Sequence, residues 1–332
     1  MMEEKTSTII QNAQKVLVIQ AENPDGDSIG SALALEEVLG DMGKEVSLFC
    51  PVEIPKYLRY IAGWDRISRE FDFSADIAII VDSTSSILLK KVLSIDGVPH
   101  FMDHHSVIVF DHHKTEGDLP FSTTDFIDEK AVSTGEIIYK IARANDWEIN
   151  ERAVTNLFIS IQSDSLGLIT ENVTAETYEI CSQLIKLGAQ PARIEAARRE
   201  LMKKPPEILD YKGRLIERIE YHLDGRLALV HVPFDEIEKY SDKYNPTMLV
   251  LDEMRLVIGV DVAIGVKTYP DGKLTGKLRS NIPVSEAIAG FFGGGGHPYA
   301  AGFRIYEQYD DFVPELIKAT TKALEEHDRE NS

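Results

Sequence analysis

Residues 15–31 read KVLVIQAENPDGDSIGS, and the fold of the N-terminal half can be worked out from them. Lys15–Gln20 is a short apolar run with β-branched residues, which predicts a buried strand. The PDG sequence at 24–26 is typical of a turn, and a helical pattern of apolar residues follows it and stops at Gly43. A strand, a polar turn and a helix in this order are typical of one repeat of an α/β fold.

Further apolar runs in the first half have the length and composition of strands. They are Glu45–Cys50, Ile77–Val81 and Val107–Phe110. Apolar strands that alternate with helices indicate a parallel sheet covered by helices on both faces. Helical patterns then dominate from about residue 133 to 221.

The pattern changes near residue 225. Arg226–Pro233 reads as a strand, and Val262–Thr268 is followed by Lys273–Arg279 across a Tyr-Pro-Asp-Gly turn, which predicts a hairpin. A helix at 284–292 runs into the glycines 293–296, and an amphipathic helix is expected over 312–327. We therefore predict an α/β protein in three parts. They are an N-terminal parallel-sheet domain at 1–190, a helical linker at 191–225 and a smaller α/β domain at 226–332, with the active site in the cleft.

Composition limits the partners and the compartment. With 332 residues the chain has room for two domains, and 35 Lys+Arg against 55 Asp+Glu give a net charge of −20. Such a chain repels long polyanions and anionic membranes unless it gathers positive charge locally or holds metal ions. Two cysteines make no disulfide framework, and no run of about 20 apolar residues is present. Residues 1–15 are polar and helix-like, so we do not expect a leader peptide. We expect a cytoplasmic protein without a membrane partner.

Acidic and imidazole groups follow the predicted strands. Asp25 and Asp27 follow the first strand and Asp82 the third, while Asp111-His112-His113 follows the fourth. Because the carboxyl ends of parallel strands share one edge of the sheet, these groups should converge there. Asp164, at the end of a helical apolar stretch, is a further candidate. A structural role is the alternative to a functional one, since Asp27, Ser28 or Asp82 could simply cap a helix.

Converging carboxylates need cations, because mutual repulsion otherwise raises their pKa values or opens the site. Oxygen-rich sites with one imidazole suit Mn²⁺ or Mg²⁺ better than a metal that prefers thiolates. Two such ions about 3.5–4 Å apart are a common device for in-line phosphoryl displacement.

Taken in order, these motifs resemble those of the DHH phosphoesterase family. The resemblance is carried by NPDGDSIGS at 23–31, VDS at 81–83, DHH at 111–113, STGE at 133–136 and Asp164. The second half is similar to the C-terminal domain associated with that family, through LRS at 278–280 and GGGGHPYAAG at 293–302. The overall length most resembles the bacterial nanoRNases, or oligoribonucleases, within the RecJ-like superfamily.

The resemblance implies a role for each matching residue. Asp82 would bridge two Mn²⁺ ions, with Asp25 serving the first ion and Asp27, His112 and Asp164 the second. His113 would face the scissile phosphate, with Asp111 orienting the histidine pair. The far end of the substrate would be held by residues of the second half, namely Arg279, Ser280, Gly294, Gly295, Gly296 and His297. Glycines let backbone N–H groups approach an anion, although a glycine run can also be a flexible linker.

The activity implied is metal-dependent hydrolysis of short RNA or DNA oligonucleotides, including linear dinucleotides, to nucleoside monophosphates. Substrates in the family also include 3′-phosphoadenosine 5′-phosphate and cyclic di-AMP. A RecJ-type processive exonuclease normally needs further domains and a basic channel, and a pyrophosphatase has a different partner domain. The sequence leaves the oligomeric state open, with a homodimer among the alternatives.

One departure from the family concerns the first metal. The family usually has a histidine two residues before the Asn-Pro, where this chain has Ala21. Alanine cannot ligate, so Gln20, Glu22 or water would have to substitute, or the first site is weakened. The alternative function is therefore a nucleotide-binding or regulatory protein with an impaired first metal site.

The second departure is a duplicated triplet, Asp103-His104-His105, eight residues before the DHH at 111–113. We assign the site to the second copy, because it directly follows the β-branched run VIVF. The residues before the first copy include Pro99, which argues against a central strand there. We expect the first copy in a surface loop. A further hypothesis is that it supplies a histidine to the first metal site, where Ala21 provides no ligand.

Overall fold

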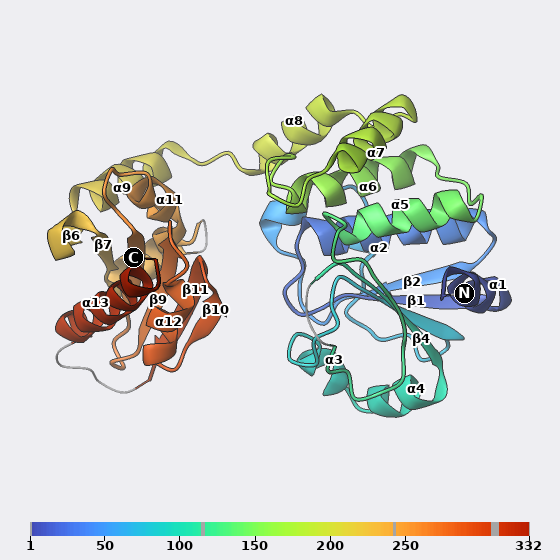
Figure 1. Cartoon of the computed structure of the whole chain (residues 1–332), viewed down its shortest axis with the longest axis horizontal. Helices are drawn as coiled ribbons and strands as arrows, with labels where there is room; N and C mark the ends of the chain where they lie inside the picture. Colours follow the sequence, from blue (N-terminus) through green and yellow to red (C-terminus); the bar gives the residue numbers. More distant parts are fainter. Residues whose placement is uncertain (1, 114–116, 242–243, 307–311, 332) are drawn as a thin grey trace. The chain divides into compact units, whose positions relative to one another are not determined.

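The first apolar run forms strand β1 (Lys15–Ile19) in the computed structural model, which describes residues 2–113, 117–241, 244–306 and 312–331 (Figure 1). It lies in a five-stranded sheet of order β2-β1-β3-β4-β5 in which all neighbouring strands are parallel. The other strands are β2 (Glu45–Phe49), β3 (Ile77–Val81), β4 (Ser106–Asp111) and β5 (Thr124–Ile127). The strands predicted for β1 to β4 are confirmed. The edge strand β5 was not predicted, because its residues carry no apolar run.

Helices cover both faces of this sheet, as predicted (Figure 1). Alternate residues of β1 separate the two cores, since Val16 and Val18 join one apolar cluster and Leu17 and Ile19 the other. The larger cluster takes side chains from α1 (Met2–Asn12), α2 (Gly26–Asp41), α5 (Thr134–Ala144), α6 (Glu151–Asp164), α7 (Ala175–Lys186) and α8 (Pro191–Leu201). The smaller one takes them from α3 (Lys90–Leu93) and α4 (Val98–His104).

The strand order reverses its direction between β1 and β3. The chain leaves β1 for β2 on one side and returns to β3 on the other, so the direction of winding reverses between these two neighbours. In open parallel sheets ligands bind at the carboxyl ends of the strands that flank such a reversal. The topology alone therefore marks the ends of β1 and β3 as the place for a site.

Helices α2 and α6 pack closely across a glycine. A Cβ atom added at Gly30 would lie 2.7 Å from the carbonyl oxygen of Asn156 and 3.0 Å from the amide nitrogen of Ser160. Backbone atoms cannot move aside as a flexible side chain can, so only glycine allows this approach. The two helices carry Asp27 and Asp164, and their spacing therefore sets the spacing of these carboxylates.

The chain divides into two units, Met1–Lys203 and Lys204–Ser332, and the second contains a mixed six-stranded sheet. The division falls inside the segment 191–225, with α8 in the first unit and α9 (Pro206–Glu217) in the second. The sheet has the order β10-β11-β9-β8-β7-β6. Its strands are β6 (Glu220–His222), β7 (Leu227–Val232), β8 (Val262–Thr268), β9 (Leu274–Ser280), β10 (Gly295–His297) and β11 (Ala300–Ile305).

The predicted hairpin is confirmed, because β8 and β9 pair antiparallel with Thr268 opposite Leu274. The glycine run, however, is partly a strand, since β10 pairs with β11. A Cβ atom at Gly294 would lie 2.3 Å from the carbonyl oxygen of Gly302, and Gly296 has a φ of +147°. These glycines are therefore needed for the close approach of two backbones, whatever else they do.

Each face of the second sheet also has an apolar cluster. One cluster packs against α12 (Ser285–Phe291) and α13 (Phe312–Glu330). The other lies under α9, α10 (Phe234–Tyr240) and α11 (Leu251–Arg255). The second unit is thus an α/β unit with its own core, and the predicted fold class is confirmed.

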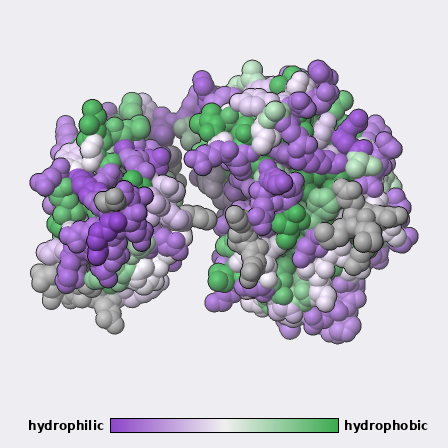
Figure 2. Space-filling model, in the orientation of Figure 1, coloured by the Kyte–Doolittle hydropathy of each residue, from purple (hydrophilic) through white to green (hydrophobic). Residues whose placement is uncertain are grey.

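In the part of the chain that the structure describes, no helix is long and apolar enough to cross a membrane. On the face shown in Figure 2, hydrophilic residues cover most of the surface and hydrophobic ones form small patches.

We predict that Gly30→Ala lowers the unfolding free energy of the N-terminal unit by about 1–3 kcal/mol, because it forces α2 and α6 apart. Gly40→Ala in the same helix is the matched control. It adds a Cβ with nothing within 4 Å, and it should raise stability by about 0.5–1 kcal/mol. Denaturant unfolding of both variants, followed by circular dichroism, measures the difference. Equal effects of the two substitutions would contradict the packing argument.

Candidate functional site

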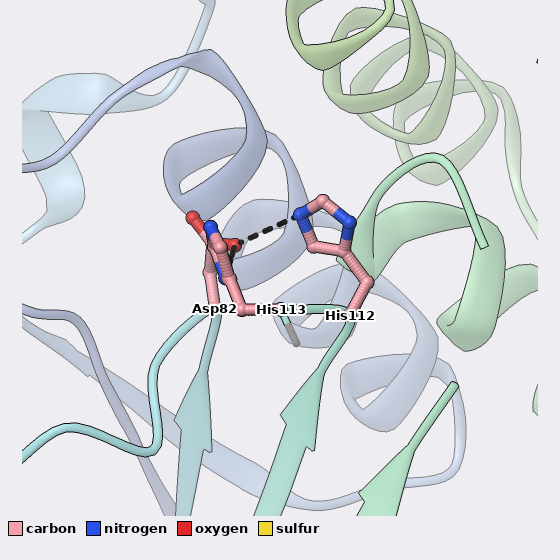
Figure 3. Close-up of side chains that lie close together, drawn as sticks. All are labelled: Asp82, His112 and His113. Carbon is pink, nitrogen blue, oxygen red and sulfur yellow. Dashed lines mark ion pairs between the residues drawn. The ribbon is translucent and has the colours of Figure 1, made fainter. Parts of the chain in front are cut away.

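Site residues predicted from the sequence follow β1, β3 and β4 at one edge of the sheet. Asp27 lies in the first turn of α2, Asp82 directly follows β3, and Asp111, the last residue of β4, precedes His112 and His113. Asp82 has a φ of +63°, a conformation that non-glycine residues seldom adopt. Such strain is often kept at functional positions, where the surrounding structure holds it in place. Figure 3 shows Asp82 and the two histidines close together above neighbouring strands.

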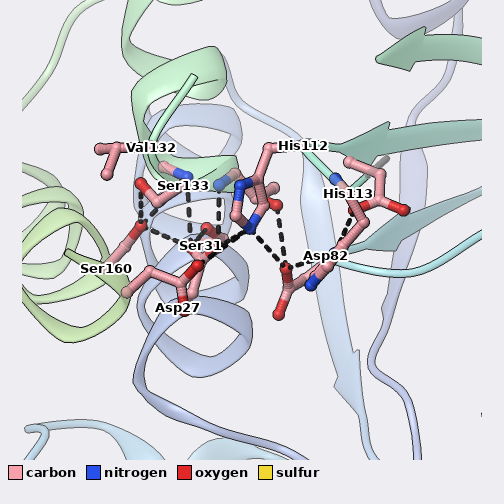
Figure 4. Close-up of polar contacts among 12 residues, drawn as sticks. Asp27, Ser31, Asp82, His112, His113, Val132, Ser133 and Ser160 are labelled. Atoms are coloured by element: carbon pink, nitrogen blue, oxygen red, sulfur yellow. Dashed lines mark hydrogen bonds and ion pairs between the residues drawn. The ribbon is translucent and has the colours of Figure 1, made fainter. Parts of the chain in front are cut away.

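Asp27 is fully buried and held by four donors (Figure 4). Its Oδ2 accepts a hydrogen bond from the amide of Thr134 at 2.8 Å. Its Oδ1 accepts from Ser160 Oγ at 2.6 Å, from Ser31 Oγ at 3.0 Å and from the amide of Gly135 at 3.3 Å. Thr134 and Gly135 begin α5, so the N-terminus of a helix faces the carboxylate, an arrangement that favours negative charge. Asp27 does not cap α2.

His112 is the centre of the arrangement. Its Nε2 lies 3.1 Å from Asp164 Oδ2, 3.5 Å from Asp27 Oδ2 and 3.6 Å from Asp82 Oδ1. This nitrogen is buried, yet it has no hydrogen bond within the part of the chain that the structure describes. Its Nδ1 lies 3.3 Å from the carbonyl oxygen of Ala131, which accepts when that nitrogen carries the proton. Once Nε2 has lost its proton, it presents a lone pair to a space bordered by three carboxylates, as in a metal-ligating histidine.

The charges around this space repel each other. The pKa of Asp82 is raised well above its ordinary value by burial and by its acidic neighbours, Asp27 first among them. For His112 burial opposes the charged form, but the carboxylates of Asp164 and Asp27 outweigh it and raise the pKa to about 9. A proton on His112 thus offsets part of the negative charge. A divalent cation would offset more, and the oxygen and imidazole donors suit Mn²⁺ or Mg²⁺.

Two groups of ligand atoms could each hold a cation. Ligand atoms of Asp82, His112 and His113 lie within 4.8 Å of one another, and so do those of Asp27, His112 and Asp164. His112 belongs to both groups but offers a single lone pair at Nε2. Asp82 has two carboxylate oxygens and is therefore the better residue to join two ions.

Asp111 orients one histidine of the pair rather than both. Its Oδ1 lies 2.7 Å from His113 Nδ1 and accepts a further hydrogen bond from the amide of His113 at 3.1 Å. This contact raises the pKa of His113, whose side chain is about half exposed. His112 is oriented by the carbonyl of Ala131 instead. The buried carboxylate thus fixes the ring of the more exposed histidine.

Asp25 caps α2. Its Oδ1 accepts hydrogen bonds from the amides of Asp27 and Ser28, and the hydroxyl of Ser28 accepts one from the amide of Asp25 in return. Burial and the neighbouring Asp27 raise the pKa of Asp25. It belongs to neither group of ligand atoms found among the described residues. Its role as a ligand of a first metal stays a prediction.

Ala21, at the position where the resemblance implies a histidine, is buried and supplies no ligand. Of the two neighbours suggested as substitutes, Glu22 lies 3.7 Å from Lys91 in an ion pair. Gln20 is fully buried, and both of its amide atoms lack a hydrogen-bond partner within the described chain. Gln20 is thus the substitute without another role in the structure.

The hypothesis that the first triplet lends a histidine to the site is wrong. Asp103 and His104 end helix α4, and His105 precedes the first residue of β4, whereas Asp111 is its last. The two triplets therefore lie at opposite ends of a six-residue strand, roughly 20 Å apart at about 3.3 Å per residue. The expected surface loop is a helix that begins at Val98, with the proline in its first turn, where proline is well tolerated.

The predicted substrate residues of the second unit lie on β9 and in the glycine run. Arg279 and the four glycines 293–296 line one cavity of about 910 Å³. Ser280 is the next residue along β9 and its side chain is on the opposite face, where its hydroxyl lies 2.8 Å from that of Ser285. The backbone of His297 ends β10, but its side chain lies outside the described part of the structure. The substrate roles of all of these residues stay predictions.

Three hydroxyl residues near the carboxylates were given no role from the sequence, although Ser31 and Thr134 stand in the motifs at 23–31 and 133–136. Ser31 and Ser160 bind Asp27, and Thr134 Oγ1 donates to Asp82 Oδ1 at 3.3 Å. The sequence did carry a clue, because Ser31 is four residues after Asp27 and Ser160 is four residues before Asp164. Residues four apart share one helix face.

Comparison with known proteins shows which family and which fold this chain resembles. Residues 15–161 match the family model described as DHH family, N-terminal domain. A Streptococcus mutans protein named probable bifunctional oligoribonuclease and PAP phosphatase NrnA is 24% identical over 91% of this chain and 93% of its own. A probable manganese-dependent inorganic pyrophosphatase of Lactobacillus acidophilus is 27% identical over 66% of this chain and 71% of its own.

Among solved structures, an exopolyphosphatase-related protein of Bacteroides fragilis superposes with a TM-score of 0.81 at 21% identity, over 98% of this chain and 96% of that one. It shows that the fold of both units occurs in a known protein. The family match identifies residues 15–161 of this chain as a DHH family N-terminal domain.

Proposed function

We propose that this chain is a metal-dependent phosphodiesterase that hydrolyses short oligonucleotides and linear dinucleotides to nucleoside monophosphates. The observation that carries the proposal is His112 Nε2, which is buried and lies within 3.6 Å of oxygens from three carboxylates. The relative named oligoribonuclease and PAP phosphatase, similar over nearly the whole chain, supports the substrate class. It also makes 3′-phosphoadenosine 5′-phosphate a second substrate to test, beside cyclic di-AMP.

The donor set fits divalent cations, and the manganese-dependent relative supports Mn²⁺. We assign Asp27, His112 and Asp164 to one ion and place Asp82 between it and a second. Asp25 would serve that second ion, whose site lacks the histidine that the resemblance implies at position 21. Cations held here would supply Lewis-acid polarisation of the phosphoryl group and an activated water nucleophile.

The protein's own groups orient the reaction. Asp111 holds Nδ1 of His113, which leaves Nε2 of that ring for an oxygen of the scissile phosphate. Helix α5 and the hydroxyls of Ser31 and Ser160 hold the Asp27 carboxylate in place. The bonds from Ser160 and Thr134 oppose the rise in the pKa of Asp27 that burial and the neighbouring Asp164 cause. Arg279 in the second unit would hold the far end of the substrate, since a guanidinium can grip a phosphate with two hydrogen bonds.

The alternative function set out from the sequence, a regulatory protein that binds nucleotides without turnover, has no support from the relatives reported above, which carry the names of enzymes. The pyrophosphatase relative makes inorganic pyrophosphate a necessary member of any substrate panel.

Asp82→Asn should lower the turnover of di- to pentanucleotides by about two orders of magnitude or more, because it removes the carboxylate best placed to join two ions. Asp103→Asn, in the first triplet at the far end of β4, is the matched control and should keep wild-type turnover. Chromatography of the mononucleotides released with added Mn²⁺ measures both. A wild-type protein that binds Mn²⁺ but cleaves no member of the panel would refute the enzyme.

Cation binding should release a proton, because the metal-free protein holds His112 with a pKa of about 9 and a ligand must be deprotonated. Affinity for Mn²⁺ should therefore rise with pH and level off once the pH passes that value. Titration calorimetry at neutral pH, in two buffers of different ionisation enthalpy, should show about one proton released when the ion at His112 binds. His104→Ala should leave this number unchanged. A heat of binding that is the same in both buffers would contradict the assignment.

A further inference from the structure

Part of the second sheet carries a row of positive side chains. Below helices α9 to α11, the apolar cluster includes residues of β7 and β8, such as Val230 and Ala263. Among the described residues it includes none from β9 or β11. On this face those two strands present polar side chains instead, because their apolar residues, such as Leu278 and Phe303, belong to the opposite cluster.

The register shows how the cations are arranged. Lys267 of β8 and Arg304 of β11 both pair with Thr275 of β9, so the two cations flank one residue. Lys277 and Arg279 are two and four residues further along β9 and therefore share its face with Thr275. We call Lys267, Lys277, Arg279 and Arg304 the cation face.

Small residues surround the central lysine of this face. Lys277 is opposite Gly265 on one side and Gly302 on the other, so nothing larger than hydrogen stands beside it on either neighbouring strand. The cavity of about 910 Å³ is lined by all four cations and by the glycines 293–296. A cavity of that size can take a ligand larger than a single phosphate.

The cation face has no acidic partner among the ion pairs that join described residues. The chain as a whole has 55 acidic residues against 35 basic ones, and other cations do find partners, as Arg226 does with Asp261 and Asp328. Burial and the neighbouring Lys277 lower the pKa of Lys267 to about 8, and burial with Arg279 and Arg304 lowers that of Lys277. Like charges held together without a counter-ion are the condition that a bound anion relieves.

We infer that the cation face binds several successive phosphate groups of one oligonucleotide, so that this unit recognises the length of the substrate. The inference rests on the proposed function and adds Lys267, Lys277 and Arg304 to it as residues that select for chain length. A dinucleotide has one phosphate between its nucleosides and can engage only part of the face. A chain of four or five nucleotides can engage all of it.

Binding should be measured on the full-length protein in EDTA, where no turnover occurs, with a fluorescein-labelled pentanucleotide as the probe. For single strands the logarithm of affinity falls with the logarithm of salt by about 0.7 for each phosphate neutralised. Four cations predict a slope of roughly −2 to −3 for the pentanucleotide and a shallower one for a dinucleotide. The Lys267→Ala/Lys277→Ala variant should bind about tenfold or more weakly, with a slope reduced by about 1.4.

Lys318→Ala/Lys322→Ala is the matched control, because it removes the same charge from exposed positions on α13. It should bind like the wild type, and Lys267→Arg/Lys277→Arg should retain most of the affinity. If the alanine pair on the sheet loses no more than this control, the inference is overturned. A melting temperature for each variant separates loss of binding from loss of folding.

Competition tests the requirement for several phosphates. Inorganic tripolyphosphate should displace the labelled pentanucleotide at concentrations where adenosine monophosphate does not. Equal displacement by both would mean that the face reads a single phosphate, against the inference. The protein could bind the pentanucleotide in a salt-dependent way, and lose that binding in the alanine pair, without hydrolysing any oligonucleotide. That result would refute the proposed function but would still support phosphate binding by the cation face.

Discussion

Mutual repulsion among closely spaced carboxylates, two of them buried, is the constraint on which the N-terminal unit depends. Oxygens of Asp27, Asp82 and Asp164 all lie within 3.6 Å of one imidazole nitrogen, and a chain does not hold such a group together without compensation. Part of this compensation is built into the fold, because the N-terminus of α5 and two serine hydroxyls face Asp27. The remainder is left to a proton or a cation at His112.

The surrounding packing serves the same group. Gly30 lets α2 approach α6, and at Gly135 an added Cβ would lie 2.1 Å from the hydroxyl of Ser160. Both glycines keep large atoms away from the helices that carry Asp27 and Asp164. The left-handed backbone at Asp82 and the order of the strands bring the third carboxylate to the same point. Helix spacing, strand order and one strained residue thus act together on a single small volume.

Much of this could be predicted from the sequence, because the information is local or periodic. Apolar runs predicted four strands of the first sheet and the β8–β9 hairpin, and polar residues at strand ends predicted which side chains converge. Edge strand β5 and the strand within the glycine run escaped prediction, since tertiary pairing rather than propensity forms them. The same holds for Ser31 and Ser160, whose spacing on helices had a meaning only once α2 and α6 were seen to pack.

The two units of this acidic chain carry local charge clusters of opposite sign. A net charge of −20 argues against a partner that is a long polyanion, yet the first unit gathers carboxylates suited to cations. The second unit places the four side chains of the cation face around a glycine-lined cavity. None of the four takes part in an ion pair between described residues. A short anionic substrate is compatible with both, because it needs only local fields.

Anomalous diffraction at the manganese edge, from crystals of the full chain soaked in Mn²⁺, tests the central claim most directly. We expect a peak within bonding distance of His112 Nε2 and of carboxylate oxygens from Asp27 and Asp164, with Asp82 between it and any second peak. A map without a peak there, with His112 paired only to the carboxylates, would contradict the account.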